Sequence, residues 1–221
     1  MKTMLVLKAS SDINDAEIKN VVSQLELYDI EATLSNIDSW KTLYETLHTE
    51  KSYDYIYLAT HGCDTSWGDI SGSVSITWIQ FAALICSSGV AKPGAIFMHS
   101  CCRGGLSQVA WQMFACCEKI EFVCGPRNNV YAVDLITAFN LFLYNIEVKR
   151  IDPVRAAEKV LLATDIRLVC FDRVETIVEH AYTTHCSNIK PAVDKAFDEI
   201  FKLEYPALAQ NLDDQISPDE N

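Results

Sequence analysis

A histidine and a pair of cysteines each follow a strand-like run of apolar residues. His61 ends one run, and the vicinal pair Cys101 and Cys102 ends another about forty residues later. A thiolate can attack an acyl carbon, and an imidazole can deliver or accept the proton that the reaction requires. These residue types therefore indicate a cysteine nucleophile with a histidine as its acid–base partner.

The elements that must position these residues alternate between strand and helix. Helix-like segments separate five strand-like runs, which we expect at residues 3–9, 30–35, 53–60, 95–100 and 120–125. Such alternation, with apolar central strands, predicts an open, mostly parallel α/β sheet with helices on both faces. The carboxyl ends of parallel strands meet at one edge of the sheet, where a ligand crevice forms. We therefore expect His61 and the cysteine pair to approach each other there.

Neighbouring residues are candidates for supporting roles. The backbone N–H groups of Gly62 and Cys102 are expected to bind the oxyanion of an acyl intermediate. Asp64 and Asp69 lie in the polar loop after His61, where a carboxylate would orient the histidine, bind a basic substrate side chain or only be solvated. Strand alternation turns His99 toward a helix layer, which favours a structural role.

Composition limits the class of protein. The 221 residues are 49% hydrophobic and carry a net charge of −12, which argues against nucleic acid or an anionic membrane as partner. No apolar segment has the length of a membrane span, and no signal-peptide pattern is present, so we predict a cytoplasmic protein. The nine cysteines include no paired CxxC or CxxH spacing, so we predict free thiols and no metal or other cofactor.

We predict one domain with an extension. Residues 1–165 are expected to form the α/β core, residues 166–212 a helical C-terminal extension of the same domain, and residues 213–221 an acidic disordered tail.

The order of these segments resembles the caspase-like cysteine peptidases, in which one apolar block ends in His-Gly and the next ends in Cys. Cys102-Arg103-Gly104 matches the Cys-Arg-Gly of the caspase nucleophile motif. Residues 53–164 look more like the CHAT branch of this clan, which includes bacterial peptidases. In that branch a strand pair and a helix follow His-Gly, as residues 71–85 do here. A Ser-Ala precedes its cysteine, and Ser100-Cys101 stands in that place. A later strand of the branch ends in Val-x-Gly, which Val123-Cys124-Gly125 matches.

The resemblance implies a caspase-like fold and an endopeptidase with a Cys-His dyad, of a kind used in bacterial defence or regulated cell death. Aligning on Cys-Arg-Gly or on Ser100 selects Cys102 as the nucleophile, whereas counting from the turn at residues 92–93 selects Cys101. It also makes Ser100, Arg103 and Asp69 candidates for substrate binding, although Arg103 could instead support the loop.

The implied partners are a protein substrate and an activator, which would be another protein, a small signalling ligand or a second copy of the chain. The main alternative is a catalytically silent caspase-fold module that binds a regulatory partner; the presence of both His61 and a candidate thiol favours the enzyme. A phosphate-binding module on a similar sheet is disfavoured, because no glycine follows the first strand.

Overall fold

Strands and helices alternate along the chain in the computed structural model, which describes residues 1–184 and 187. The elements, in chain order, are β1 (Lys2–Lys8), α1 (Asp15–Leu27), β2 (Ile30–Asn36), α2 (Trp40–Leu47), β3 (Tyr53–Ala59), β4 (His61–Gly62), β5 (Ser66–Gly68), β6 (Ser75–Thr77), α3 (Trp78–Ser88), β7 (Ala91–Ser100), α4 (Ser107–Cys116), β8 (Ile120–Pro126), α5 (Ala132–Glu147), α6 (Pro153–Thr164) and β9 (Leu168–Asp172).

Six strands form the central sheet, in the order β2-β1-β3-β7-β8-β9. The first five are parallel to their neighbours, and β9 pairs antiparallel with β8. The predicted open, mostly parallel sheet is confirmed. The sequence analysis did not predict β9, and the turn expected at Lys92–Gly94 lies inside β7, where the register with β8 is irregular and Gly94 has a φ of 83°.

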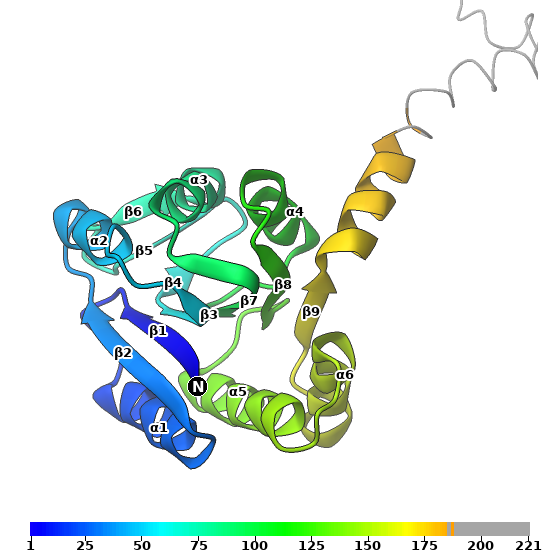
Figure 1. Ribbon diagram of the computed structural model, residues 1–221, viewed down its shortest axis with the longest axis horizontal. Helices are drawn as coiled ribbons and strands as arrows, with labels where there is room; N and C mark the ends of the chain where they lie inside the picture. Colours follow the sequence, from blue (N-terminus) through cyan, green and yellow to red (C-terminus); the bar gives the residue numbers. More distant parts are fainter. Residues whose placement is uncertain (185–186, 188–221) are drawn as a thin grey trace, which may run out of the picture. The chain divides into compact units, whose positions relative to one another are not determined.

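Two helix layers cover the two faces of the sheet (Figure 1). The core on one face packs α2, α3 and α4 against alternate strand residues such as Ile56 and Leu58. The core on the other face packs α1, α5 and α6 against Tyr55 and Tyr57. Because successive strand residues point to opposite faces, the central strands are apolar on both sides and hold their carboxyl ends rigidly.

Side-chain caps begin several of these helices. The Asn14 side chain accepts a hydrogen bond from the Ala16 N–H at the start of α1. Thr77 forms a capping box with Gln80 at the start of α3. Each cap satisfies backbone N–H groups that the first turn leaves without a partner.

A small antiparallel sheet of β4, β5 and β6 follows β3 directly. Trp67 and Ile76 anchor it in the core, and the Trp78 indole N–H donates to the Cys63 carbonyl at 2.9 Å. This hairpin sheet extends the chain beyond β3 and carries His61 at its first residue.

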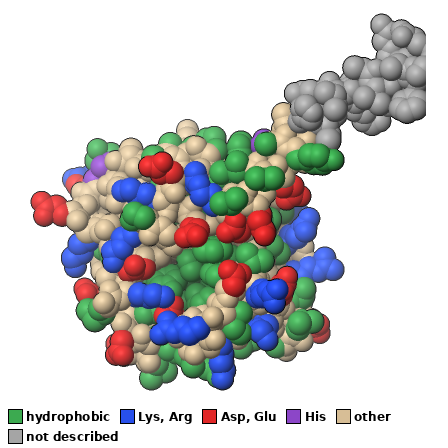
Figure 2. Space-filling view, turned by 45° about the vertical axis from the view of Figure 1, so that its right-hand side comes forward, with side chains coloured by type: hydrophobic (Ala, Val, Ile, Leu, Met, Phe, Trp, Pro, Cys, Tyr) green, Lys and Arg blue, Asp and Glu red, His purple; other side chains and the backbone are tan. Residues whose placement is uncertain are grey.

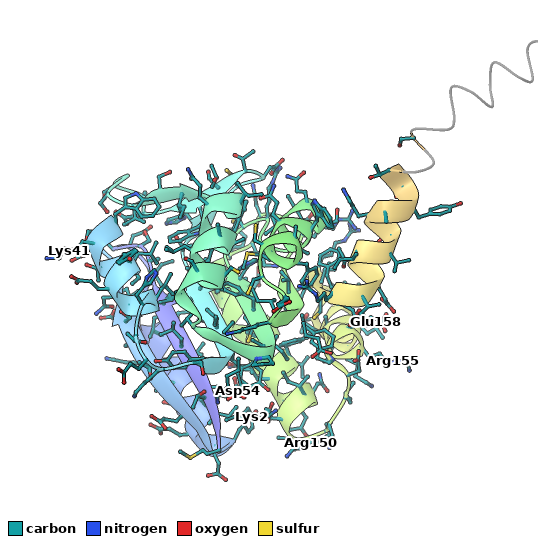
Figure 3. The ribbon with its side chains drawn as sticks, turned by 45° about the horizontal axis from the view of Figure 1, so that its top comes forward. Lys2, Lys41, Asp54, Arg150, Arg155 and Glu158 are labelled. Carbon is teal, nitrogen blue, oxygen red and sulfur yellow. The ribbon has the colours of Figure 1, made fainter. Side chains whose placement is uncertain are left out.

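Polar side chains form hydrogen-bonded clusters at the amino ends of the strands, at the edge of the sheet opposite to His61. Asp54 at the start of β3 accepts hydrogen bonds from the Thr3 N–H at 2.7 Å and the Lys92 ammonium at 2.8 Å. Lys2 donates to the buried carboxylate of Glu147, at the end of α5, at 2.8 Å. Figure 3 labels Lys2 and Asp54 at this end of the sheet, together with Arg150 just beyond α5.

The chain divides into a unit of residues 1–177 and a second unit of residues 178–221. In the second unit, residues 178–184 are helical, as predicted. The predicted extension, residues 166–212, contains β9 near its start, whereas the predicted helix at 192–203 and the acidic tail 213–221 lie outside the described residues. The division into core, extension and tail stays a prediction.

Figure 2 shows a face of the molecule on which acidic and basic side chains are interspersed around a hollow lined by hydrophobic side chains. Within residues 1–184 and 187, no helix combines the length and the apolar character that crossing a membrane requires.

Candidate active site

Two neighbouring central strands place the histidine and the cysteine pair. β3 and β7 are adjacent and parallel, and Ala59 is paired with Ser100 in their register. The Thr60 N–H then donates to the Ser100 carbonyl at 3.3 Å. His61 and the cysteines therefore leave the sheet at the same height.

The two cysteines differ in their surroundings. Cys101 continues the alternation of β7 into the core, where its side chain is 1% exposed, and this burial raises the pKa of its thiol far above the usual range. Cys102 points to the other side and is only half-buried, with its Sγ 3.8 Å from the carbonyl oxygen of Val130. Cys102 is therefore partly accessible, whereas the Cys101 thiol is a packing group.

Glycine is required at two positions around the buried thiol. A Cβ atom at Gly62 would lie 2.6 Å from the Cys102 carbonyl oxygen and 2.9 Å from the Cys101 Sγ. A Cβ atom at Gly104 would lie 3.0 Å from the same Sγ and 2.4 Å from the Cβ of His99. The His-Gly segment and the cysteine loop are therefore in direct backbone contact.

The geometry of the hairpin leaves one amide available at the crevice. The Cys63 N–H donates to the Ser66 carbonyl at 2.9 Å, which closes the turn between β4 and β5. Hydrogen-bonded and non-bonded pairs alternate along an antiparallel ladder, so the Gly62 N–H points away from β5. It lies on the side of the cysteine loop.

Asp12 holds the imidazole of His61. The Nε2 atom of His61 lies 2.9 Å from each carboxylate oxygen of Asp12, in the loop after β1. Because a carboxylate only accepts, Nε2 carries the proton, and Nδ1 of the neutral ring is the basic nitrogen. A hydrogen bond from Ser10, followed by the one from His61, lowers the pKa of Asp12. The sequence analysis missed Asp12.

Neither of the acidic residues expected near the histidine contacts it. Asp64 instead accepts a hydrogen bond from the guanidinium of Arg103. Asp69 accepts hydrogen bonds from serine side chains and backbone N–H groups, which lower its pKa to well below the usual range. Both carboxylates are engaged within the protein.

Arg103 links the two loops of the site. Its backbone has a φ of 60°, a left-handed conformation that is uncommon for a residue with a side chain, and its N–H donates to the Asn128 carbonyl at 3.3 Å. Its guanidinium bonds to Asp64, whose carbonyl accepts from the Gln108 side chain at 2.8 Å. In this arrangement Arg103 contacts both loops, and its role in substrate binding stays a prediction.

Ser100 and His99 both point into the interior. The Ser100 hydroxyl donates to Glu17 at 2.9 Å, and desolvation raises the pKa of this buried carboxyl. The His99 Nδ1 donates to the Gly104 carbonyl at 2.8 Å, and burial lowers the pKa of the ring to about 4. His99 is thus a neutral core residue packed against Trp78 and Phe97.

A second accessible thiol adjoins the site and was not predicted. Cys63 is exposed, and hydrogen bonds from Ser66 and then Thr65 lower its pKa to about 7. A sequence signal was present, because the cysteine follows His61-Gly62 and precedes the hydroxyl-bearing residues of a turn.

Comparison with known proteins bears on the fold. No protein-family model and no curated protein matches the sequence. Among solved structures, a secreted C11 cysteine protease from Bacteroides thetaiotaomicron, in complex with an irreversible peptide inhibitor, is similar with a TM-score of 0.58 at 10% identity, over 79% of this chain and 66% of that one. An inactive zymogen of a C11 protease from Parabacteroides distasonis is similar with a TM-score of 0.54 at 13% identity, over 79% and 62%.

The chain spans less than two thirds of the length of either structure. At these identities the similarity shows the fold alone. The chain has the caspase-like fold of the C11 cysteine proteases, as the resemblance in the sequence implied.

Proposed function

We propose that the chain is a cysteine endopeptidase with Cys102 as nucleophile and His61 as its acid–base partner. One observation carries the proposal. On neighbouring strand ends, a half-buried thiol and an imidazole held by a carboxylate leave the sheet at the same height, and the adjacent thiol of Cys101 is packed away. The similarity in fold to two cysteine proteases supports it.

The proposed mechanism assigns a task to each group. The thiolate of Cys102 attacks the carbonyl carbon of a peptide bond, and the oxyanion that forms accepts hydrogen bonds from the N–H groups of Gly62 and Cys102. Nδ1 of His61 has taken the proton of the Cys102 thiol to form this thiolate, and it gives that proton to the leaving amine as the C–N bond breaks. It then takes a proton from the water that hydrolyses the thioester, which releases the acid and restores Cys102.

The proposals of a CHAT-type peptidase, a protein substrate and an activator rest on the resemblance in the sequence. The order His-Gly, strand pair, helix and cysteine supports the CHAT branch, since β4, β5, β6 and α3 occur in that order before β7. A protein substrate follows from this assignment. An activating partner, ligand or second copy would have to order the half-exposed imidazole of His61 and the Cys102 loop before they become competent.

The deciding experiment is exposure of the full chain to a peptide library, with and without lysate from its own cell as a source of activator. We expect cleavage products from the wild type. Cys102→Ala and His61→Ala should each lower the rate by about 10⁴ or more, because the nucleophile and its base act as a unit.

The matched control is Cys101→Ala, which should retain cleavage because its thiol is in the core. Cleavage by Cys102→Ala with loss in Cys101→Ala would reverse the assignment of the nucleophile. Unchanged cleavage in both variants would refute the peptidase, and absence of any product with all additions would favour the silent binding module.

A further inference from the structure

The carboxylate of Asp69 joins two segments that are far apart in the sequence. Its Oδ1 atom accepts from the Ser10 hydroxyl at 2.7 Å, from the Ser11 N–H at 2.8 Å and from the Ser11 hydroxyl at 3.1 Å. Its Oδ2 atom accepts from the Ser71 N–H at 3.2 Å, from the Ser73 hydroxyl at 3.0 Å and from the Ser71 hydroxyl. One oxygen therefore holds the loop after β1, and the other holds the turn between β5 and β6.

Ser10 relays this connection toward the active site. Its side chain is buried, with the residue 2% exposed, and its hydroxyl accepts from the Ile70 N–H at 3.2 Å. The same hydroxyl lies 2.5 Å from the Oδ1 of Asp12 and 2.7 Å from the Oδ1 of Asp69. The hydroxyl has one proton, which it can donate to only one of the two carboxylates at a time, so Ser10 links Asp12 and Asp69 through a shared proton.

Asp12 completes the path to His61. Both of its carboxylate oxygens lie 2.9 Å from Nε2, and within the described part of the chain Asp12 is the only hydrogen-bond partner of the imidazole. The His61 side chain is 49% exposed, so packing alone does not fix its ring. Its orientation therefore depends on the loop that Asp69 and Ser10 hold.

We propose that Asp69 is a positioning residue for His61, acting through Ser10 and Asp12. The proposal rests on the function proposed above and differs from the expectation that Asp69 binds substrate, because both of its oxygens are occupied by donors from the protein. An amide cannot replace the carboxylate, since donors face both oxygens and the NH₂ group of asparagine would meet one of the two sets.

The experiment measures kcat, KM and the pH profile of cleavage for Asp69→Asn, for Asp12→Asn and for the double variant. We expect Asp69→Asn to lower kcat about tenfold with KM changed by less than about twofold, as for a group that acts only on the acid–base step. The double variant should be no slower than Asp12→Asn alone, because the two residues act along one path.

Three results would overturn the proposal. A higher KM with unchanged kcat would show that Asp69 contacts the substrate. Losses that multiply in the double variant would show independent action. An equal loss of kcat in the control Asp54→Asn would show a general effect on folding, since Asp54 accepts a comparable set of bonds from Thr3 and Lys92 at the opposite end of the sheet.

A second readout keeps the proposal testable if the wild type cleaves no peptide and the proposed function fails. In a Cys63→Ser background, the rate of alkylation of Cys102 by iodoacetamide is measured against pH. Asp69→Asn and Asp12→Asn should change this profile in the same direction, because both release His61 beside the thiol. A profile that Asp12→Asn changes and Asp69→Asn does not would refute the positioning role.

Discussion

Polar groups gather at both ends of the sheet, but they are partnered in different ways. At the amino end, Glu147 is 8% exposed and accepts from the Lys2 ammonium and the Tyr55 hydroxyl, and Asp54 is paired with Lys92. Each buried or half-buried carboxylate there has its own lysine. This is how a protein neutralises charge for stability.

At the carboxyl end, Asp64 is paired with Arg103, whereas Asp12 and Asp69 are held without a lysine or arginine among the described residues. Asp12 binds a hydroxyl and an imidazole, and Asp69 binds hydroxyls and backbone N–H groups. The thiols of Cys63 and Cys102 remain accessible beside them. The amino end is a closed network, whereas the carboxyl end keeps groups with unused chemistry, which is the pattern of a reactive site.

Thiol reactivity should show the largest difference. Near neutral pH, iodoacetamide should label Cys63 and Cys102 rapidly and Cys101 more slowly by about a thousandfold, since a buried thiol with a strongly raised pKa forms little thiolate. About half of the Cys63 side chains should be thiolates at pH 7, because the pKa of this thiol is about 7. Mass spectrometry of the labelled peptides locates each adduct.

Cys63→Ser is the control for this labelling, because it removes the second accessible thiol of the site and leaves Cys102. One rapid adduct should then remain among the site cysteines. Faster labelling of Cys101 than of Cys102 would contradict the assignment of the nucleophile.

Replacing Asp12, the hydrogen-bond partner of His61, should have the next largest effect. Asp12→Asn removes the charge beside Nε2 and presents an amide that can donate as well as accept, so the ring loses its fixed tautomer. We expect kcat/KM to fall about a hundredfold, within the range of general acid–base effects. Steady-state kinetics on a cleaved library peptide measure it, and a change of less than twofold would show that the pair is not used.

The pH dependence of this contact has a defined sign. The pKa of Asp12 is lowered in the folded protein, so its stabilising contribution is present above the unfolded pKa of about 4 and is lost as the pH falls through the lower, folded value. Between pH 5 and 8, Asp12 stays ionised. The difference in the free energy of unfolding between the wild type and Asp12→Asn, measured by urea denaturation, should therefore stay constant with respect to this group between roughly pH 5 and 8.

The sequence predicted the parts of the site that follow from strand ends. His61, Gly62 and Cys102 were predicted at strand ends because apolar runs indicate buried strands and parallel strands share a carboxyl edge, and the structure places them there. Alternation along β7 also places the two cysteines on opposite faces, although the sequence alone left Cys101 as an alternative nucleophile. Local patterns carry this much information because the strand period decides which side each residue faces.

Contacts between loops were not predictable in the same way. Asp12 and His61 are 49 positions apart, and Ser10 and Asp69 are 59 apart, so no local spacing relates them. β9 was missed because it has only five residues, with two of them buried. The segment becomes a strand because it pairs antiparallel with β8, and this tertiary pairing overrides a weak local signal.

A substitution at the amino end of the sheet should have the smallest effect, and it should change stability alone. Glu147→Gln removes a negative charge that the Lys2 ammonium contacts at 2.8 Å and the Tyr55 hydroxyl contacts directly, while Arg150 lies 3.5 Å from the other oxygen. Lys2 is 46% exposed, so water compensates part of its loss. We expect the free energy of unfolding to fall by about 1–2 kcal/mol, measured by urea denaturation.

Glu45→Gln is the matched control for this change. Glu45 and Lys41 form an exposed pair at 3.8 Å on α2, and such pairs contribute less than about 1 kcal/mol. Neither variant should alter cleavage or thiol labelling, because neither residue contacts the carboxyl end of the sheet. If Glu147→Gln changed the pH profile of cleavage as Asp12→Asn does, the two ends would be coupled, and the division between a stabilising and a reactive end would be wrong.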